Sequence, residues 1–498
     1  MNRIAVLSPL GDKLCFAVLP ILVAVSMGLL TATQPPALML VLFGVASLIL
    51  LLTITPFSAF MLLMILTPMR TLIQTESSFQ LPLEIGQLTV LVMMAAWAVH
   101  RIVHGRKLLD FTWSSIYIPL IGFITIGGLT ILNAISVGAW LNEWLKWVLM
   151  LIMAVLVVSI AGKLRWEWLV LGLVMAGIAN ALIGFYIFFG GSGALHLLIN
   201  NRFFRAFGTF GQPNPFGGFM GLLAPLALTA ALGYLMIFWS RWRQTKQIAI
   251  ELIIPLIFYS SAFVLIAGGV IISWSRGAWL AFVVSIAMIM VALPRKIWQG
   301  LGLLFAASLL IAGLWLTGKL PISIAERIQS STAELFTFDD VRALDITPEN
   351  YAVVERLAHW QAATNMAWNN PWFGVGLGNY EAAYARYRLI NWDMALGHAH
   401  NSYLNVLAET GIIGLSVYVV LWISIVYFTW WTRKHPDLIA RYVAVGLLGT
   451  WTYMTVHSLT DNLYVNNIFL HLGVMLGILA TLYGQTWKSY KVGANDPS

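Results

Sequence analysis

The sequence predicts an all-α polytopic membrane protein with 12 to 14 transmembrane helices and one large, partly helical extracytoplasmic loop. Of its 498 residues, 60% are hydrophobic and only 10% are charged, whereas a soluble domain carries about 25% charged residues. The apolar residues gather into runs of about 20, the length that crosses a bilayer as a helix. The 22 Trp and 16 Tyr residues suit the aromatic belts at membrane interfaces.

The apolar runs define the candidate spans in chain order. The first run has no small-residue cleavage site, so we expect a retained helix rather than a signal peptide. Two pairs of runs are short or closely spaced, 36–54 with 57–73 and 250–273 with 277–294, and this sets the lower limit of 12 spans. The candidates are 14–32, 36–54, 57–73, 84–103, 114–133, 143–161, 166–189, 214–239, 250–273, 277–294, 298–317, 402–431, 438–458 and 464–487.

We expect one membrane domain, residues 1–498, with no separate soluble domain. It divides into an N-terminal helix bundle (14–317), the large extracytoplasmic loop (318–401) and the C-terminal transmembrane helices (402–487). The loop contains a helix-like pattern at 349–369 and then a turn-rich segment, NNPWFGVGLGNYEAAYARY. A long loop with secondary structure of its own usually has a function.

The basic residues predict the orientation. Most of the 28 Lys and Arg residues fall in alternate loops, which are cytoplasmic by the positive-inside rule. This places both termini in the cytoplasm and accounts for the net charge of +8 without a nucleic-acid partner. Histidines 398 and 400 then lie outside, with a set of basic residues that break the rule: Arg70, Arg202, Arg205, Arg276, Lys319, Arg327, Arg342, Arg356, Arg386 and Arg388.

Three outside arginines are candidates for binding phosphate. Arg202 and Arg205 precede the Gly-rich FGTFGQPNPFGG at 207–218, and Arg276 lies in SWSRGAW between two apolar runs. Arginine suits bidentate phosphate recognition, and an arginine at membrane depth normally faces a polar cavity. The alternatives are headgroup anchors, with Arg276 snorkelling from a tight outer turn.

The segment HAHNSYLNVLAETGIIG, residues 398–414, carries the candidate base. His400 precedes an apolar run that Asn401 would cap, and a histidine there can take a proton near neutral pH. His398 and Glu409 are supporting candidates, and Asp461 with Asn462 lies in a short outer loop on the same side. The alternative is a hydrogen-bonded structural histidine. We expect no metal, because no third ligand is evident in the sequence.

Other catalytic patterns are absent from the sequence. GxSxG, HExxH and P-loop motifs do not occur, which disfavours an ATP-driven machine. We expect no cofactor.

Together these motifs resemble the O-antigen ligase/polymerase superfamily of bacterial membrane glycosyltransferases. The resemblance covers roughly residues 200–480 through FRAFGTFGQPNPFGG, SWSRGAW, NPWFGVGLGNY and the histidine segment. The ligase pattern is His, then Asn, Ser or Gln, nine residues, Gly, two residues and Gly. His400-Asn401, Gly411 and Gly414 match it completely.

The resemblance implies a metal-independent, inverting glycosyltransferase of the bacterial plasma (inner) membrane. Its donor would be an undecaprenyl-pyrophosphate-linked glycan, its acceptor a lipid, protein or glycan, and its active site extracytoplasmic. By motif position His400 is the base, Arg205 and Arg276 bind the pyrophosphate, and Arg202 is a less certain match.

Two alternatives stay open. One is a repeat-unit polymerase of the same fold, which the ligase-type motif disfavours. The other is a lipid-linked glycan transporter or flippase, which would not explain the structured outer loop ending in histidines.

Overall fold

The computed structural model describes most of the chain beyond residue 111. The described ranges are 112–161, 166–317 (without 192, 193, 200 and 201), 341–343 and 350–494, preceded by 85–103, with isolated positions at 61–69, 105 and 346. The predicted spans 14–32 and 36–54, most of 57–73, and residues 318–340 of the large loop lie outside these residues.

Helices dominate the described structure, and each predicted span from 84–103 onward coincides with one. Seven of the described helices are long and apolar enough to cross a membrane, so the all-α polytopic prediction is confirmed. Pro213 starts the longest helix, at a position where its missing N–H costs nothing. The helices of the bundle are α5 (Ile85–Val103), α6 (Tyr117–Leu129), α7 (Val137–Ala161), α8 (Trp166–Tyr186), α9 (Pro213–Thr245), α10 (Ile250–Ile272), α11 (Arg276–Ala292), α12 (Ile297–Leu316), α16 (Ser402–Thr432), α17 (Leu438–His457) and α18 (Ile468–Ala494).

The polar segments add shorter elements. The helix predicted at 349–369 is α14 (Tyr351–Asn369), but the segment predicted to be turn-rich ends in a further helix, α15 (Tyr380–Tyr387). Its sequence YEAAYARY is rich in helix formers, and the preceding glycines make the turn. A hairpin of β1 (Leu198–Ile199) and β2 (Phe203–Phe204) precedes Arg205. The remaining short turns are η1 (Thr67–Met69), η2 (Thr130–Asn133), η3 (Ile187–Gly191), η4 (Leu195–Leu197) and η5 (Val341–Ala343).

Helix α9 is the centre of the bundle. It packs along α10 and α17, while α11 packs on both α17 and α9, and α18 packs on α7. Two hydrogen bonds hold α17 against α9: Tyr453 donates to the carbonyl of Gly217 at 2.9 Å, and Thr450 donates to that of Leu222 at 2.8 Å. The loop that follows α17 is therefore fixed beside the first turn of α9.

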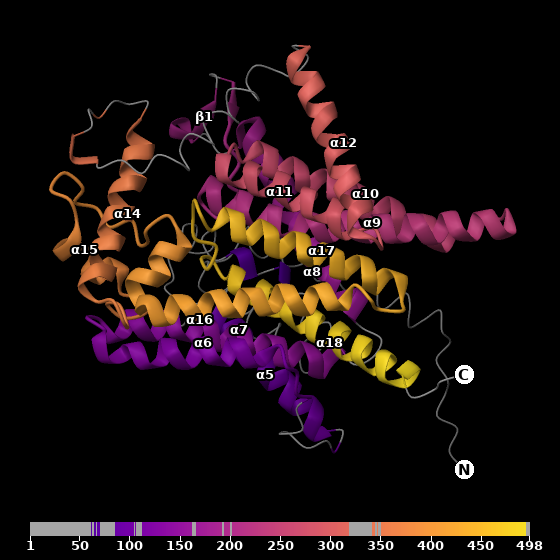
Figure 1. Ribbon diagram of the computed structural model, residues 1–498, viewed down its shortest axis with the longest axis horizontal. Helices are drawn as coiled ribbons and strands as arrows, with labels where there is room; N and C mark the ends of the chain where they lie inside the picture. The colour runs from indigo at the N-terminus through magenta and orange to yellow at the C-terminus, as the bar shows by residue number, and fades with distance from the viewer. Residues whose placement is uncertain are drawn as a thin grey trace, which may run out of the picture.

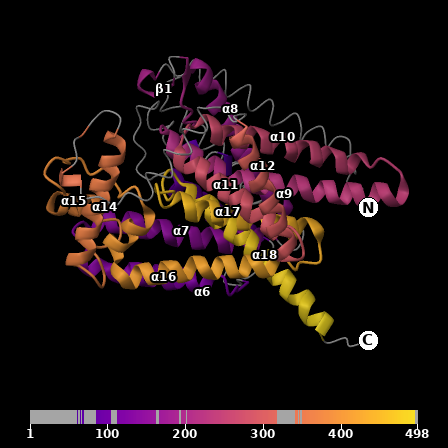
Figure 2. The same ribbon diagram turned by 45° about the horizontal axis from the view of Figure 1, so that its top comes forward.

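The helices of the large loop, α14 and α15, lie at one end of the bundle. Figures 1 and 2 show α14 and α15 together beside the first turns of α16, while the far ends of α9 and α18 lie at the opposite end. This arrangement separates a structured polar end from the end that carries Arg241, Arg243, Lys434 and Lys488.

A break in α16 anchors the outer loop. Gly411 has φ 65° and ψ −168°, a conformation essentially restricted to glycine. The freed amide of Ile412 donates to Pro371 at 2.8 Å, and the loop amide of Val375 donates to Ala408 at 3.0 Å. A side chain at Gly411 would collide with the Trp372 carbonyl. The second half of the histidine motif therefore serves as a docking site for the loop.

Candidate functional site

Two short connections between bundle helices bring Arg205 and Arg276 together. They are the β1–β2 hairpin that leads into α9 and the turn between α10 and α11. The strand leading into Arg205 is tied to the end of α10, because Ala206 donates to the Ile272 carbonyl at 3.0 Å. The Arg205 guanidinium donates to the Ser273 carbonyl at 3.3 Å and to Asn214 Oδ1 at 3.4 Å. Arg276 follows the turn and is the first residue of α11. Two of the three arginines that the sequence assigned to phosphate, Arg205 and Arg276, thus line one cavity.

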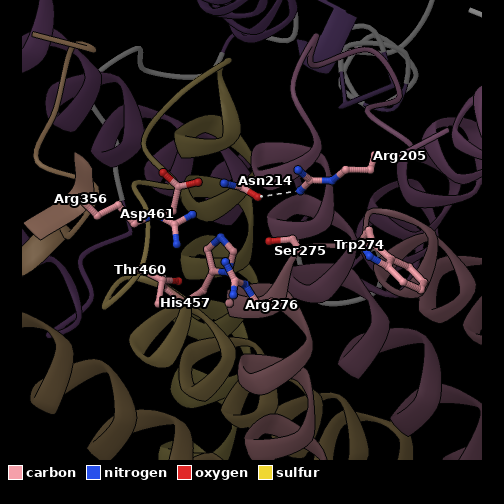
Figure 3. Close-up of a pocket in the computed structure, with 10 residues that line it drawn as sticks. Arg205, Asn214, Trp274, Ser275, Arg276, Arg356, His457, Thr460 and Asp461 are labelled. Carbon is pink, nitrogen blue, oxygen red and sulfur yellow. Dashed lines mark hydrogen bonds between the residues drawn. The ribbon is translucent and has the colours of Figure 1, made fainter. Parts of the chain in front are cut away.

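This cavity has a volume of about 110 Å³, larger than the roughly 10–15 Å³ that one water needs. The first turns of α9 and α11 both reach it, through Asn214 and through Arg276 with Gly277. Helix N-termini carry free amides and a partial positive charge, which favour anions. The cavity is therefore suited to a multivalent anion. The side chains around it are those of Arg205, Asn214, Trp274, Ser275, Arg276, Arg356, His457, Thr460 and Asp461 (Figure 3).

Asp461 joins this cavity to the candidate base. Its carboxylate lines the cavity and also lies 3.5 Å from His400 Nδ1 and 3.7 Å from His398 Nε2. Burial raises the pKa of Asp461, but the nearby imidazoles of His400, His398 and His457 lower it by more, so the net pKa is well below its usual range. Asp461 is therefore an ionised carboxylate between the histidines and the arginines.

The backbone at His400 is held in a strained position. His400 has φ 52°, in the left-handed region that residues other than glycine rarely adopt. Its amide donates to His398 Nδ1 at 3.0 Å, and the preceding amide of Ala399 donates to Asn405 Oδ1 at 3.1 Å. Asn401 caps α16 as predicted, accepting from the amides of Tyr403 and Leu404. These bonds fix the backbone on both sides of His400, from which its ring projects toward Asp461.

The hydrogen bonds determine which nitrogens carry protons. Because His398 accepts a bond at Nδ1, its proton in the neutral form lies on Nε2, which faces Asp461. Burial lowers the pKa of His398 to about 4, against the opposing effect of Asp461, so it is neutral near pH 7. His400 directs Nδ1 toward Asp461, which leaves Nε2 with a free lone pair in the neutral ring. This is the tautomer that a general base requires.

The ring nitrogens and the carboxylate also determine whether His398, His400 and Asp461 could bind a metal ion. His398, His400 and Asp461 place one potential ligand atom each within 4.8 Å of one another, so a third metal ligand, absent from the sequence prediction, is present in space. However, a neutral imidazole has one lone pair, and that of His398 already accepts the His400 amide. The donor set therefore suits proton handling better than metal binding.

Two predicted site residues, Glu409 and Arg202, belong neither to the cavity lining nor to the histidine segment at Asp461. Glu409 is buried on α16, and its carboxylate accepts the Tyr380 amide at 3.2 Å, so it caps the start of α15. Arg202 is exposed on the hairpin, with its guanidinium over the Phe203 ring. The structure thus brings Arg205, Arg276 and His400 together around Asp461 and leaves these two outside.

Four polar residues around the cavity were not assigned to the site from the sequence. Asn214 stands between two prolines at the start of α9, and Thr460 precedes Asp461. Arg356 belongs to the outside basic set, but nothing in the sequence connects α14 with Arg276. His457, the last residue of α17, is fully buried and reads from the sequence as part of an apolar run.

The comparisons with known proteins agree with this geometry. No curated protein matches the chain. Residues 261–419 match a protein family described as O-Antigen ligase, and this range runs from α10 through α11, α14 and α15 to the break in α16. It includes Arg276, Arg356 and His400. This match supports the resemblance of the chain to the O-antigen ligase superfamily.

Proposed function

We propose that this protein is an O-antigen ligase-like glycosyltransferase. It transfers a glycan from an undecaprenyl-pyrophosphate carrier to an acceptor at the outer face of the bacterial plasma membrane. The O-antigen ligase domain supports the ligase/polymerase type of activity. The observation that carries the finer proposal is the position of Asp461, which contacts His400 and lines the arginine cavity.

In this reaction His400 acts as the general base. Its Nε2 accepts the proton of an acceptor hydroxyl while that oxygen attacks the anomeric carbon of the donor sugar. The new C–O bond forms as the bond to the pyrophosphate oxygen breaks, and the electron pair leaves with the lipid pyrophosphate. Asp461 holds the ring and stabilises the imidazolium that forms, as a carboxylate does behind a catalytic histidine. A single displacement inverts the anomeric centre.

Arg205 and Arg276 stabilise the leaving group. Charge develops on the pyrophosphate as the glycosidic bond breaks, and fixed donors aimed at that charge lower the barrier. The N-terminal turns of α9 and α11 contribute in the same direction. The donor is already activated, so this chemistry requires neither ATP nor a metal-bound nucleophile.

We also propose that the cavity faces the outside of the cell and that both termini are cytoplasmic. The basis is the charge distribution, because the opposite ends of α9, α16 and α18 carry clusters of Lys and Arg that favour the cytoplasmic side. The site would then meet donor and acceptor in the outer leaflet.

The test is a reconstituted transfer assay in proteoliposomes with a defined undecaprenyl-pyrophosphate-linked glycan. We expect a new glycosidic bond with wild type and none with His400→Ala, expressed and folded to the same level. Near-normal transfer by His400→Ala would overturn the base assignment. Carrier movement across the bilayer with no new bond would indicate a transporter, and extension of carrier-linked glycans alone would indicate the polymerase.

A further inference from the structure

His457 is a buried histidine that the proposed reaction does not use. It ends α17, has 0% exposure and lines the cavity around Arg205 and Arg276. Its ring lies near the backbone of Gly277, yet neither ring nitrogen makes a hydrogen bond of standard geometry to the described residues. An unpaired buried polar group is costly. A group of this kind in the wall of a cavity therefore indicates a ligand that pairs with it.

The packing around His457 holds its ring against the cavity. Tyr453, one turn earlier on α17, stacks on the ring with centroids 5.5 Å apart and an interplanar angle of 14°. On α9, a methyl group at Gly218 would lie 3.3 Å from His457 Nε2, so the glycine leaves room for the ring. Figure 3 shows the ring in the middle of the cavity, between Thr460 and Ser275. These contacts direct the ring toward an anion bound there.

The charges that face His457 make its protonation depend on the ligand. Asp461 supplies the carboxylate of the cavity lining, but it is shared, because it also lies 3.5 Å from His400 Nδ1. Nearby cations disfavour an imidazolium, and a nearby anion favours it. The ring is therefore neutral before the donor binds, and a bound pyrophosphate shifts it toward the charged form. The groups around the ring are Arg205 before α9, Arg276 on α11, Arg356 on α14 and Asp461 after α17, with the Tyr453 hydroxyl on α17 itself.

We propose that His457 takes up a proton when the donor binds and passes it to the pyrophosphate as the sugar is transferred. This inference rests on the proposed function. It adds a general acid to a reaction in which only the base, His400, has been assigned. The acid and the base belong to two different segments that meet at Asp461.

The protons balance over one turnover. His457 takes one proton from solvent as the donor enters the cavity. When the bond between the anomeric carbon and the pyrophosphate oxygen breaks, its electron pair stays on that oxygen, which receives the proton from the imidazolium. His400 holds the proton of the acceptor hydroxyl and returns it to solvent before the next cycle. The lipid pyrophosphate therefore leaves with one proton, and both histidines return to the neutral form.

The charge of the substrate explains why an acid is useful in a cavity that already contains arginines. A carrier-linked donor is a diester of pyrophosphate with one negative charge on each phosphate. The leaving oxygen gains a further negative charge as the sugar departs, and a proton cancels it. Without that proton the product would be held more tightly than the donor, because the extra charge strengthens its attraction to every guanidinium group. Proton transfer therefore assists both bond cleavage and product release.

The first test measures proton uptake by isothermal titration calorimetry of the purified full chain. The ligand is a short-chain prenyl pyrophosphate sugar, a diester whose phosphates stay ionised at neutral pH, and acceptor is left out. Titrations at pH 7 in two buffers with different enthalpies of ionisation give the number of protons bound with the ligand. We expect wild type and His400→Gln to take up roughly half to one proton for each ligand bound, and His457→Gln to take up almost none.

The second test is the pH dependence of kcat in the proteoliposome assay. A base and an acid in the same complex give a bell-shaped profile. We expect wild-type kcat to fall at high pH as His457 loses its proton, and this fall to disappear in His457→Gln. At neutral pH the kcat of His457→Gln should be lower on the order of 100-fold, the lower end for general acid catalysis, because pyrophosphate is already a good leaving group.

His435→Gln is the matched control for both tests. His435 lies in the connection between α16 and α17, at the other end of α17 from His457, with its Nε2 3.2 Å from Gln485 Oε1. Its replacement removes one histidine outside the cavity, so proton uptake and the pH profile should match those of wild type.

The outcomes separate this inference from the proposed function. Wild type that binds the ligand without taking up a proton, or that shows no fall in kcat at high pH, overturns the acid role, and neither measurement depends on the folding of a variant. Proton uptake that persists in His457→Gln also overturns it. In each of these cases transfer by wild type leaves the glycosyltransferase proposal intact. If wild type forms no glycosidic bond, the proposed function fails and this inference fails with it.

Discussion

Replacing Asp461 with asparagine tests how the base and the anion cavity are connected. The substitution keeps the shape of the side chain, and the amide oxygen can still accept the Asn462 N–H that Asp461 Oδ1 binds at 2.8 Å. What it removes is the negative charge beside His400.

The magnitude follows from the 3.5 Å separation of His400 Nδ1 and the carboxylate. At an effective dielectric of about 20, a full charge pair at this distance is worth about 5 kcal/mol, which corresponds to more than three orders of magnitude in rate. Water in the cavity and the neighbouring His398 reduce this value. We therefore expect kcat to fall roughly 10²- to 10³-fold, with the KM for donor nearly unchanged.

The assay is steady-state transfer with purified protein in proteoliposomes at fixed acceptor and varied donor. The double variant His400→Ala with Asp461→Asn is the control, because a carboxylate that acts through His400 adds little further loss once the histidine is gone. A kcat within about threefold of wild type for Asp461→Asn would refute the orienting role. A loss confined to KM would instead make Asp461 part of donor binding alone.

Three further predictions follow from the same structure. Arg276→Lys should lower kcat/KM for donor by at least about tenfold, because lysine cannot form the bidentate fork; near-normal donor kinetics would contradict the phosphate role. Gly411→Ala should lower stability by roughly 1–3 kcal/mol, seen as a lower midpoint of thermal unfolding, whereas Gly302→Ala on α12, where an added methyl meets nothing within 4 Å, should not. Burial lowers the pKa of His359 to about 4, so the unfolded chain binds more protons between pH 4 and 6.5 and stability rises with pH across this range. His359→Gln should reduce this increase in the free energy of unfolding by about 3 kcal/mol, measured as thermal midpoints at pH 4.5 and pH 7. An unchanged dependence on pH would show that His359 does not titrate in this way.

The fold was predictable because the bilayer imposes a simple rule on the sequence. A run of about 20 apolar residues has few alternatives to a helix, so the spans from 84–103 onward were located to within a few residues, apart from the start of α7 and the ends of α9 and α18. The Lys and Arg residues at the helix ends also predicted how the helices are oriented in the membrane. The helix α15 was missed because the three glycines and the proline before it predict turns across the whole segment.

The site was predictable only where a single residue is chemically conspicuous. Arg276 stands out because a charge between two apolar runs requires a polar partner or cavity, and His400 stands out at the boundary of a span. Arg356 and His457 carry no such local signal. They reach the cavity through the docking of α14 on α16 and the packing of α17 on α9, and both are contacts between segments far apart in the chain.

Glu409 shows why the motif extends well beyond its histidine. The nine residues that separate His400-Asn401 from Gly411 form about two and a half turns of α16, with the base at one end and the helix break at the other. Between them, Glu409 caps α15 through the Tyr380 amide, while Asn405 holds the amide of Ala399 next to the base. The break then receives the turn that follows α14. One helix therefore fixes both the direction of His400 and the docking of the loop that supplies Arg356. A change at Gly411 should for this reason reduce transfer without touching any atom of the cavity.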